Sequence, residues 1–294
     1  MLGHSDNNAN TSPTTNRRCE GEVLGQDGSV SDPVPPSSDE PLVVTHDGAV
    51  ATLWLNRPDK RNAVTEAMWA GITRTCAELA DDASVRVLVV RGNGEHFCAG
   101  ADIAELSGLA GRTDYNAVNK AADDALAAFP RPTVAFIQGS CVGGGAEIAI
   151  SCDLRIAEST ARFGITPARL GIVYPPFALE RAVAVIGPAA AKHLLYSAEL
   201  IGAERAHHIG LVHEVHDPGL AEDRARSLAH ELAVERSLLT QQATKEMIAS
   251  ITMTGAVTPE VEARWTARSD EAADAAEGLA AFLERRPPRF TWTP

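Results

Sequence analysis

The stretch GSCVGGGAE, residues 139–147, decides the fold of this 294-residue chain. It follows the apolar run TVAFI at 133–137, which is typical of a strand buried on both faces of a sheet. The residues around Glu147 predict the start of a short buried helix. A turn between a strand and a helix leaves backbone N–H groups free at the helix start, where the helix dipole favours negative charge. Glycine lets a ligand approach that backbone without a side chain in the way.

A second loop of the same kind, FCAGADI at 97–103, follows the apolar run 85–90. Neither loop carries the Gly-Lys-Ser/Thr ending of a phosphate-binding P-loop. Two loops that each offer one N–H suit a thioester oxygen that becomes an enolate, which is oxyanion-hole chemistry. The alternative is that the glycines only allow tight packing of helix against sheet, and spacing by itself leaves both interpretations open.

Apolar runs and helical patterns alternate along residues 41–235 and predict an α/β core. Thr65 is expected to cap the first helix. Residues 236–294 are rich in Ala, Glu and Arg and predict a C-terminal helical region. Residues 1–40 contain no aromatic residue and many Ser, Asn, Asp, Pro and Gly, so they predict a disordered extension. The other expected strands are 50–55, 154–157, 161–163 and 211–215, and further helical patterns cover 188–197, 203–209 and 219–234.

The composition excludes several classes of protein. The net charge of −13 argues against nucleic-acid and anionic-membrane partners, because both need a basic surface. No apolar run approaches the roughly 18 residues of a membrane-spanning helix. The five cysteines contain no C-x-x-C pair, which argues against a disulfide framework and a structural zinc site. A cytoplasmic protein with reduced thiols is expected.

Four motifs carry a family resemblance: NRPDKRNA at 56–63, FCAGADI at 97–103, GGGAE at 143–147 and AFLERRP at 281–287. In this order they resemble the crotonase, or enoyl-CoA hydratase/isomerase, superfamily. The resemblance implies a spiral core of ββα turns with a C-terminal helical trimerisation region. It also implies an acyl-CoA substrate and assembly as a homotrimer or a dimer of trimers.

The resemblance further implies a set of site residues. The two N–H groups of the oxyanion hole fall on Ala101 and Gly144. Metal and redox cofactors are not implied, since CoA arrives as part of the thioester substrate. The implied substrate- and CoA-binding residues are Lys60, Arg61, Ala99, Ala101, Asp102, Ile103, Ala104, Gly143, Gly144, Phe282 and Arg285. Of these, Phe282 and Arg285 match positions that reach the CoA of a neighbouring subunit, and Lys60 and Arg61 have the alternative of being ordinary solvated charges.

Hydratases of this family use two glutamates, and the first falls on Glu147. Its apolar neighbours Ile148, Ala149 and Ile150 predict partial desolvation and a raised pKa. The alternative is a glutamate stabilised by the helix dipole. The second glutamate's position falls on Pro167, which cannot transfer a proton. The chain has no Asp or Glu between Ala161 and Leu179, which argues against two-carboxylate hydration and leaves a proton shift or another enolate reaction open to one carboxylate with an oxyanion hole.

Two alternatives to this function stay open. The stretch TPARLGIVY at 166–174 resembles the family's malonyl-type decarboxylases, which act on methylmalonyl- or ethylmalonyl-CoA and place a tyrosine at Tyr174. Loss of CO2 creates the enolate without a base, so the oxyanion hole would do most of that work. Tyr174 can instead simply pack in a loop. The other alternative is a CoA-thioester-binding protein with little turnover.

Overall fold

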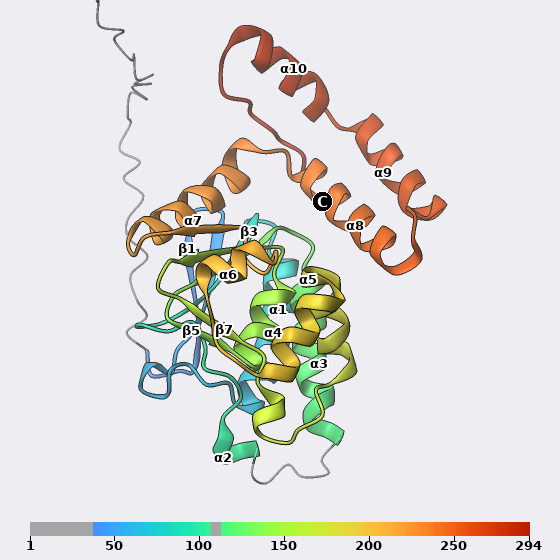
Figure 1. The fold of residues 1–294 in the computed structure, drawn as a ribbon. Helices are drawn as coiled ribbons and strands as arrows, with labels where there is room; N and C mark the ends of the chain where they lie inside the picture. Colours follow the sequence, from blue (N-terminus) through green and yellow to red (C-terminus); the bar gives the residue numbers. More distant parts are fainter. Residues whose placement is uncertain (1–37, 107–112) are drawn as a thin grey trace, which may run out of the picture. The chain divides into compact units, whose positions relative to one another are not determined.

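The computed structural model describes residues 38–106 and 113–294 (Figure 1). The predicted extension, residues 1–40, lies outside the described residues except for its last three. There, the carbonyl oxygens of Ser38 and Glu40 each accept a hydrogen bond of 2.8 Å from the Asn56 side chain.

The described residues form a six-stranded sheet in the order β1-β2-β3-β4-β6-β9. Strand β1 pairs with β2 in antiparallel fashion, and the other neighbours in this sheet are parallel. The strands are β1 (Leu42–Asp47), β2 (Val50–Leu55), β3 (Val87–Gly92), β4 (Thr133–Ile137), β6 (Leu154–Glu158) and β9 (Glu214–His216). Both β2 and β4 have the predicted bounds, whereas the run expected at 85–90 forms its strand two residues later.

Alternate residues of this sheet enter two different cores, as the period of two in a strand requires. In β3, Leu88 and Val90 join the larger core, while Val87 and Val89 face helix α7 (Leu220–His230). Small residues on α7, Ala225 among them, allow the helix to pack closely on that face. Burial on both faces explains why the central strands read as nearly continuous apolar runs.

The helices that pack around the larger core include α1 (Glu66–Asp81), α3 (Thr113–Ala127), α4 (Gly144–Ser151) and α5 (Pro176–Ser197). They form a chain of contacts in which α3 touches α1 and α4, and α4 touches α5 (Figure 1). Thr65 caps α1 as predicted, its side chain accepting a hydrogen bond from Met68 N at 3.2 Å. Helix α5 begins well before the predicted 188–197 because the chain continues through a kink, where Gly187 has φ of 72° ahead of Pro188.

A three-stranded sheet carries the second glycine loop. It consists of β5 (Ser140–Val142), β7 (Arg162–Gly164) and β8 (Ile201–Gly202), with β7 in the middle. The amide of Gly143 donates a 2.9 Å hydrogen bond to the carbonyl of Gly164. The start of α4 is therefore held against the end of β7. The strand expected at 161–163 is β7, displaced by one residue. Of the strand expected at 211–215, only the end is extended, and it forms β9, which begins at Glu214 and ends one residue later than predicted.

The predicted C-terminal helical region is present as α8 (Leu238–Thr254), α9 (Pro259–Glu271) and α10 (Asp274–Glu284). Lys245 of α8 ties this region to the core, since its Nζ lies 2.8 Å from the Asp153 carboxylate. Asp153 also accepts a hydrogen bond from Thr133 N at 2.8 Å, so it joins the turn between α4 and β6 to the start of β4. The described residues include no helix that is long and apolar enough to cross a membrane.

Candidate active site

The two glycine loops lie side by side. Cys98 N donates to Ser140 O at 2.8 Å, and Val142 N donates to Cys98 O at 3.0 Å. Gly100 and Gly143, one from each loop, both have positive φ. An added Cβ at Gly143 would lie 3.8 Å from the Gly100 Cα. The positive φ favours glycine at both positions, and at Gly100 an added Cβ would also crowd the Val142 carbonyl oxygen at 3.1 Å.

This pairing brings the two predicted oxyanion-hole amides together. A Cβ built on Gly144 would lie 3.4 Å from Ala101 N and 3.0 Å from the Trp69 ring. Within the described part of the chain, neither the Ala101 nor the Gly144 amide has a hydrogen-bond acceptor. Gly144 is the first residue of α4, where an amide has no acceptor inside the helix. Two adjacent N–H groups are therefore without an acceptor among the described residues.

Glu147 lies three residues further along α4 and is buried, with 7% of its surface exposed. Its Oε2 accepts a 2.9 Å hydrogen bond from Asn119 Nδ2 of α3. Burial raises the pKa of Glu147, and the interactions with Asn119 and Tyr174 lower it in part. The predicted desolvation of this carboxyl is thus confirmed, and a raised pKa brings a carboxyl closer to the range in which it can both accept and release a proton.

Tyr174 lies beside Glu147 rather than packing out of reach in its loop. Its hydroxyl is buried and makes no hydrogen bond of ordinary geometry among the described residues. Burial raises the pKa of Tyr174 well above its ordinary value, and the negative charge of Glu147 raises it further. The Tyr174 hydroxyl is therefore protonated and can act as a donor toward Glu147.

Pro167, at the position where a second glutamate was looked for, begins the short 3-10 helix η2 (Pro167–Arg169). Its φ is limited by the ring, which suits the first position of such a turn. The side chain offers no proton donor or acceptor. The position expected for a second glutamate thus carries no titratable side chain.

The candidate CoA-binding residues in and before α2 (Ile103–Leu106) lie next to a loop that side-chain hydrogen bonds hold in place. The buried Asn62 side chain accepts a hydrogen bond from Arg57 N at 2.8 Å and donates one to His96 O at 2.6 Å. Arg57 lies 2.9 Å from Asp102, and this contact lowers the pKa of the Asp102 carboxyl. Lys60 and Arg61 are exposed on the same loop. This loop thus holds two exposed cations close to the first glycine loop, since Ala99 N donates to Arg61 O at 2.9 Å.

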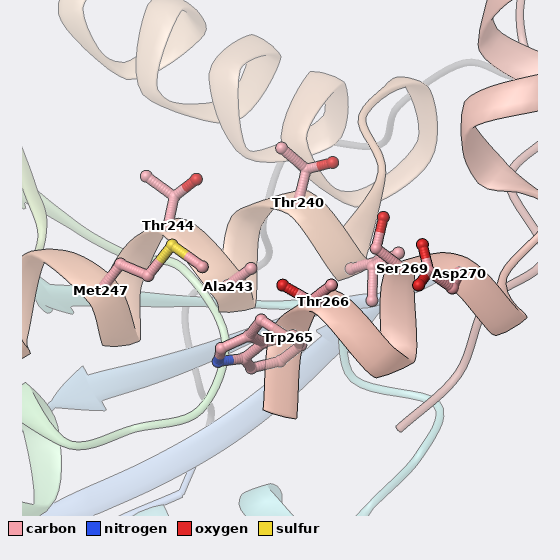
Figure 2. Close-up of a pocket in the computed structure, with 9 residues that line it drawn as sticks. Thr240, Ala243, Thr244, Met247, Trp265, Thr266, Ser269 and Asp270 are labelled. Atoms are coloured by element: carbon pink, nitrogen blue, oxygen red, sulfur yellow. The ribbon is translucent and has the colours of Figure 1, made fainter. Parts of the chain in front are cut away.

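The structure does not bring every predicted residue to Glu147. Phe282, 80% exposed, and Arg285 are on and just after α10 in the C-terminal region. A groove between α8 and α9 is lined by Thr244, Met247 and Trp265 among others, and includes none of the predicted site residues (Figure 2). The described residues contain no cluster of three or more His, Cys, Asp or Glu that could hold a metal ion.

Sequence reasoning missed Asn119 and Asp123, which α3 places next to α4. Asp123 is fully buried, although it is followed by a second aspartate, a pattern that usually indicates a solvated surface. One signal was present: Asn119 and Asp123 are four residues apart, and so are Ala122 and Leu126 of the same buried face. Helix α3 itself was not predicted, and a spacing of four residues indicates a shared face only in a segment that is known to be helical.

Comparison with known proteins identifies the class. A family model for enoyl-CoA hydratase/isomerase matches residues 45–293. The crotonyl-CoA hydratase of Syntrophomonas wolfei is 31% identical over 257 residues, which cover 85% of this chain and 98% of the relative. The 2,3-dehydroadipyl-CoA hydratase of Escherichia coli is 31% identical over 251 residues, with the same coverage of each chain.

A solved structure agrees with the sequence relatives. An enoyl-CoA hydratase/carnithine racemase from Magnetospirillum magneticum has a TM-score of 0.82 and 32% identity, covering 86% of this chain and 96% of that chain. The chain therefore belongs to the enoyl-CoA hydratase/isomerase family of the crotonase superfamily. It is an enzyme of this family that acts on acyl-CoA, as the motifs predicted.

Proposed function

We propose that this enzyme shifts a double bond in an enoyl-CoA thioester through an enolate, with the thioester oxygen held by the amides of Ala101 and Gly144. The single observation that carries this proposal is the position of Glu147, buried on α4 less than one turn after Gly144. Preorganised N–H groups stabilise charge where it develops, and a buried carboxylate nearby moves the proton.

The proton balance of this reaction needs one base. Glu147 as carboxylate removes a proton from C2 of a 3-enoyl thioester, and the electron pair moves onto the thioester oxygen. The same carboxyl then returns the proton to C4, the double bond settles at C2–C3, and Glu147 is a carboxylate again. Hydration would ask for a second acid–base group, and Pro167 supplies none. The proposal needs no cofactor beyond the CoA of the substrate.

CoA is proposed to lie along the first glycine loop. Lys60 and Arg61 would meet its phosphates, and Ile103, 69% exposed, would contact its apolar part. Asp102 is engaged with Arg57 and also accepts a 3.0 Å hydrogen bond from Ala104 N, so it would shape this segment rather than bind CoA with its own carboxylate.

The test is mass spectrometry of acyl-CoA thioesters incubated with the purified protein in heavy water. The panel holds 2-enoyl, 3-enoyl, saturated and malonyl-type thioesters. Conversion of a 3-enoyl to a 2-enoyl thioester, with exchange at C2 or C4, is the expected result. Gain of water would replace the proposal by hydration, and loss of CO2 would replace it by decarboxylation. Thioester binding without any change would favour a binding protein.

Decarboxylation is the second candidate because Tyr174 lies beside Glu147. Tyr174→Phe distinguishes the two. In an isomerase the variant removes an interaction that lowers the pKa of Glu147. The acid limb of kcat/KM against pH then moves to higher pH while the plateau is retained. In a decarboxylase that depends on the Tyr174 hydroxyl, turnover falls at every pH, by about 10²-fold. The measurement is the pH profile of each variant with the active thioester.

The enzyme is further proposed to form a homotrimer or a dimer of trimers. The C-terminal helices expose large apolar side chains, among them Ile248, Met253, Leu279 and Phe282. Exposed apolar surface of this extent is typical of an interface between protein subunits. Phe282 and Arg285 would then reach the CoA of a neighbouring subunit. Sedimentation equilibrium is expected to give the mass of three or six chains, and a monomer would contradict the proposal.

A further inference from the structure

Helices α3 and α4 share a ladder of polar side chains inside the larger core. Asn119 and Asp123 are one turn apart on α3, and Glu147 and Ser151 are one turn apart on α4. Asn119 pairs with Glu147 at 2.9 Å, and Ser151 lies near Asp123 on the following rung without a hydrogen bond of ordinary geometry between them. Four residues of helix advance by about 6 Å. A second carboxyl therefore stands about one helical turn from the proposed base.

The surroundings of Asp123 do not support an ionised carboxylate. The residue is 0% exposed, and neither carboxyl oxygen has a hydrogen-bond partner of ordinary geometry among the described residues. An ionised carboxylate without solvent or partners is strongly disfavoured, so such a group keeps its proton. The hydroxyls of Ser151 and Tyr174, also buried and without a partner of ordinary geometry, complete this polar cluster.

Charged groups face Asp123 from each element around it. They are Asp124 on α3, Glu147 on α4 and Arg181 on α5, with Tyr174 in the segment before α5. The guanidinium of Arg181 is bonded to Asp124 at 2.5 Å rather than to Asp123. Burial raises the pKa of Asp123 well above its ordinary value, and the negative charge of Glu147 raises it further, while Arg181 opposes this shift.

We propose that Asp123 and Glu147 form a coupled pair of buried carboxyls that holds one proton in the resting enzyme, with the proton on Asp123 and the charge on Glu147. Asp123 acts through Glu147 and is a positioning residue. Its neutral form leaves Glu147 as the single carboxylate base of the site. Its ionisation at high pH would add a second negative charge beside the forming enolate. The proposal rests on the proposed function only for the role of Glu147 as base.

The first test needs no turnover. Infrared difference spectra between the wild type and Asp123→Asn at pH 8 are expected to show the carbonyl stretch of a protonated carboxylic acid in the wild type alone. This band should titrate away at a lower pH in Glu147→Gln, because the charge that holds the proton on Asp123 is then missing. Absence of the band at pH 8, or the same titration midpoint in Glu147→Gln, would overturn the proposal.

The second test is the pH profile of kcat/KM with the active thioester. Asp123→Asn, which imitates the protonated acid, is expected to keep its activity at neutral pH and to lose the alkaline limb. Asp124→Asn is the matched variant on the same helix, and it should retain that limb but move it to lower pH, since the Asp124 charge also raises the pKa of Asp123. An unchanged alkaline limb in Asp123→Asn would mean a purely structural aspartate.

The two arms separate failure of the inference from failure of the proposed function. An infrared band that shifts in Glu147→Gln, together with no turnover of any thioester, upholds the carboxyl pair and rejects the isomerase. Turnover with no such band rejects the pair and upholds the enzyme. Asp123→Asn should also unfold at a higher temperature than the wild type at pH 8, with the difference closing near pH 4. At pH 8 the folded wild type, unlike the variant, must keep the Asp123 carboxyl protonated, and this carboxyl ionises on unfolding.

Discussion

Glu147→Gln is expected to lower kcat by about 10³-fold while leaving thioester affinity unchanged. The amide has nearly the shape of the carboxyl and its oxygen can still accept the hydrogen bond from Asn119, which is 2.9 Å long in the native protein. What the variant loses is the ability to take a proton and return it. Stopped-flow or coupled assays measure kcat, and calorimetric titration with a substrate analogue measures affinity.

The stability of Glu147→Gln separates lost chemistry from lost structure. Burial raises the pKa of Glu147 above its value in the unfolded chain. A group of this kind lowers stability as the pH rises above the unfolded pKa, because the folded protein holds a proton that the unfolded chain releases. The variant should therefore unfold at the same or a higher temperature than the wild type at pH 8, with the difference vanishing toward pH 4.

A matched control for this change is Glu158→Gln. Glu158 ends β6, is only partly buried and makes a 3.3 Å contact with Thr160 in an exposed turn. It should keep full turnover. If Glu147→Gln retained the wild-type kcat, Glu147 would not be the base, and the case for an enolate mechanism in this site would be lost with it.

Gly144→Ala is the second large effect, with an expected loss of about 10²-fold or more in kcat/KM. The added methyl would lie 3.4 Å from Ala101 N and 3.0 Å from the Trp69 ring, in the space between the two proposed oxyanion donors. The backbone at Gly144 does not need a positive φ, so alanine fits the helix start. The loss would thus come from the methyl obstructing the thioester oxygen rather than from a strained backbone.

Gly278→Ala in α10 provides the control. A Cβ there would meet the Phe290 ring at 3.5 Å, an ordinary contact, inside a regular helix. Turnover should be unchanged, and the free energy of unfolding should rise by about 0.5–1 kcal/mol, since alanine loses less backbone entropy on folding. Wild-type turnover in Gly144→Ala would show that the thioester oxygen is bound elsewhere.

The strands and the glycine loops could be predicted from the sequence because each depends mainly on the residues within its own segment. Strand β4 is apolar at each position after Thr133 and buried on both faces, so its bounds could be predicted without knowing its neighbours. Thr65 caps α1 through its own side chain. Helix α3 was missed because its exposed side is polar and only one face is apolar, as with Ala122 and Leu126, and that face is recognisable only against α1 and α4.

The candidate site likewise has features that the local sequence predicts and features that only packing creates. The glycine motif and the position of Glu147 in it determined the family, the helix start and the proposed base, since a backbone that must approach a ligand requires glycine at fixed positions. Only the tertiary structure decided what surrounds that base. Asn119 and Asp123 reach it from 24 or more residues away in sequence, across a contact between two helices. A carboxyl's protonation depends on burial and on neighbouring charges, and both are properties of the packed chain rather than of any single segment.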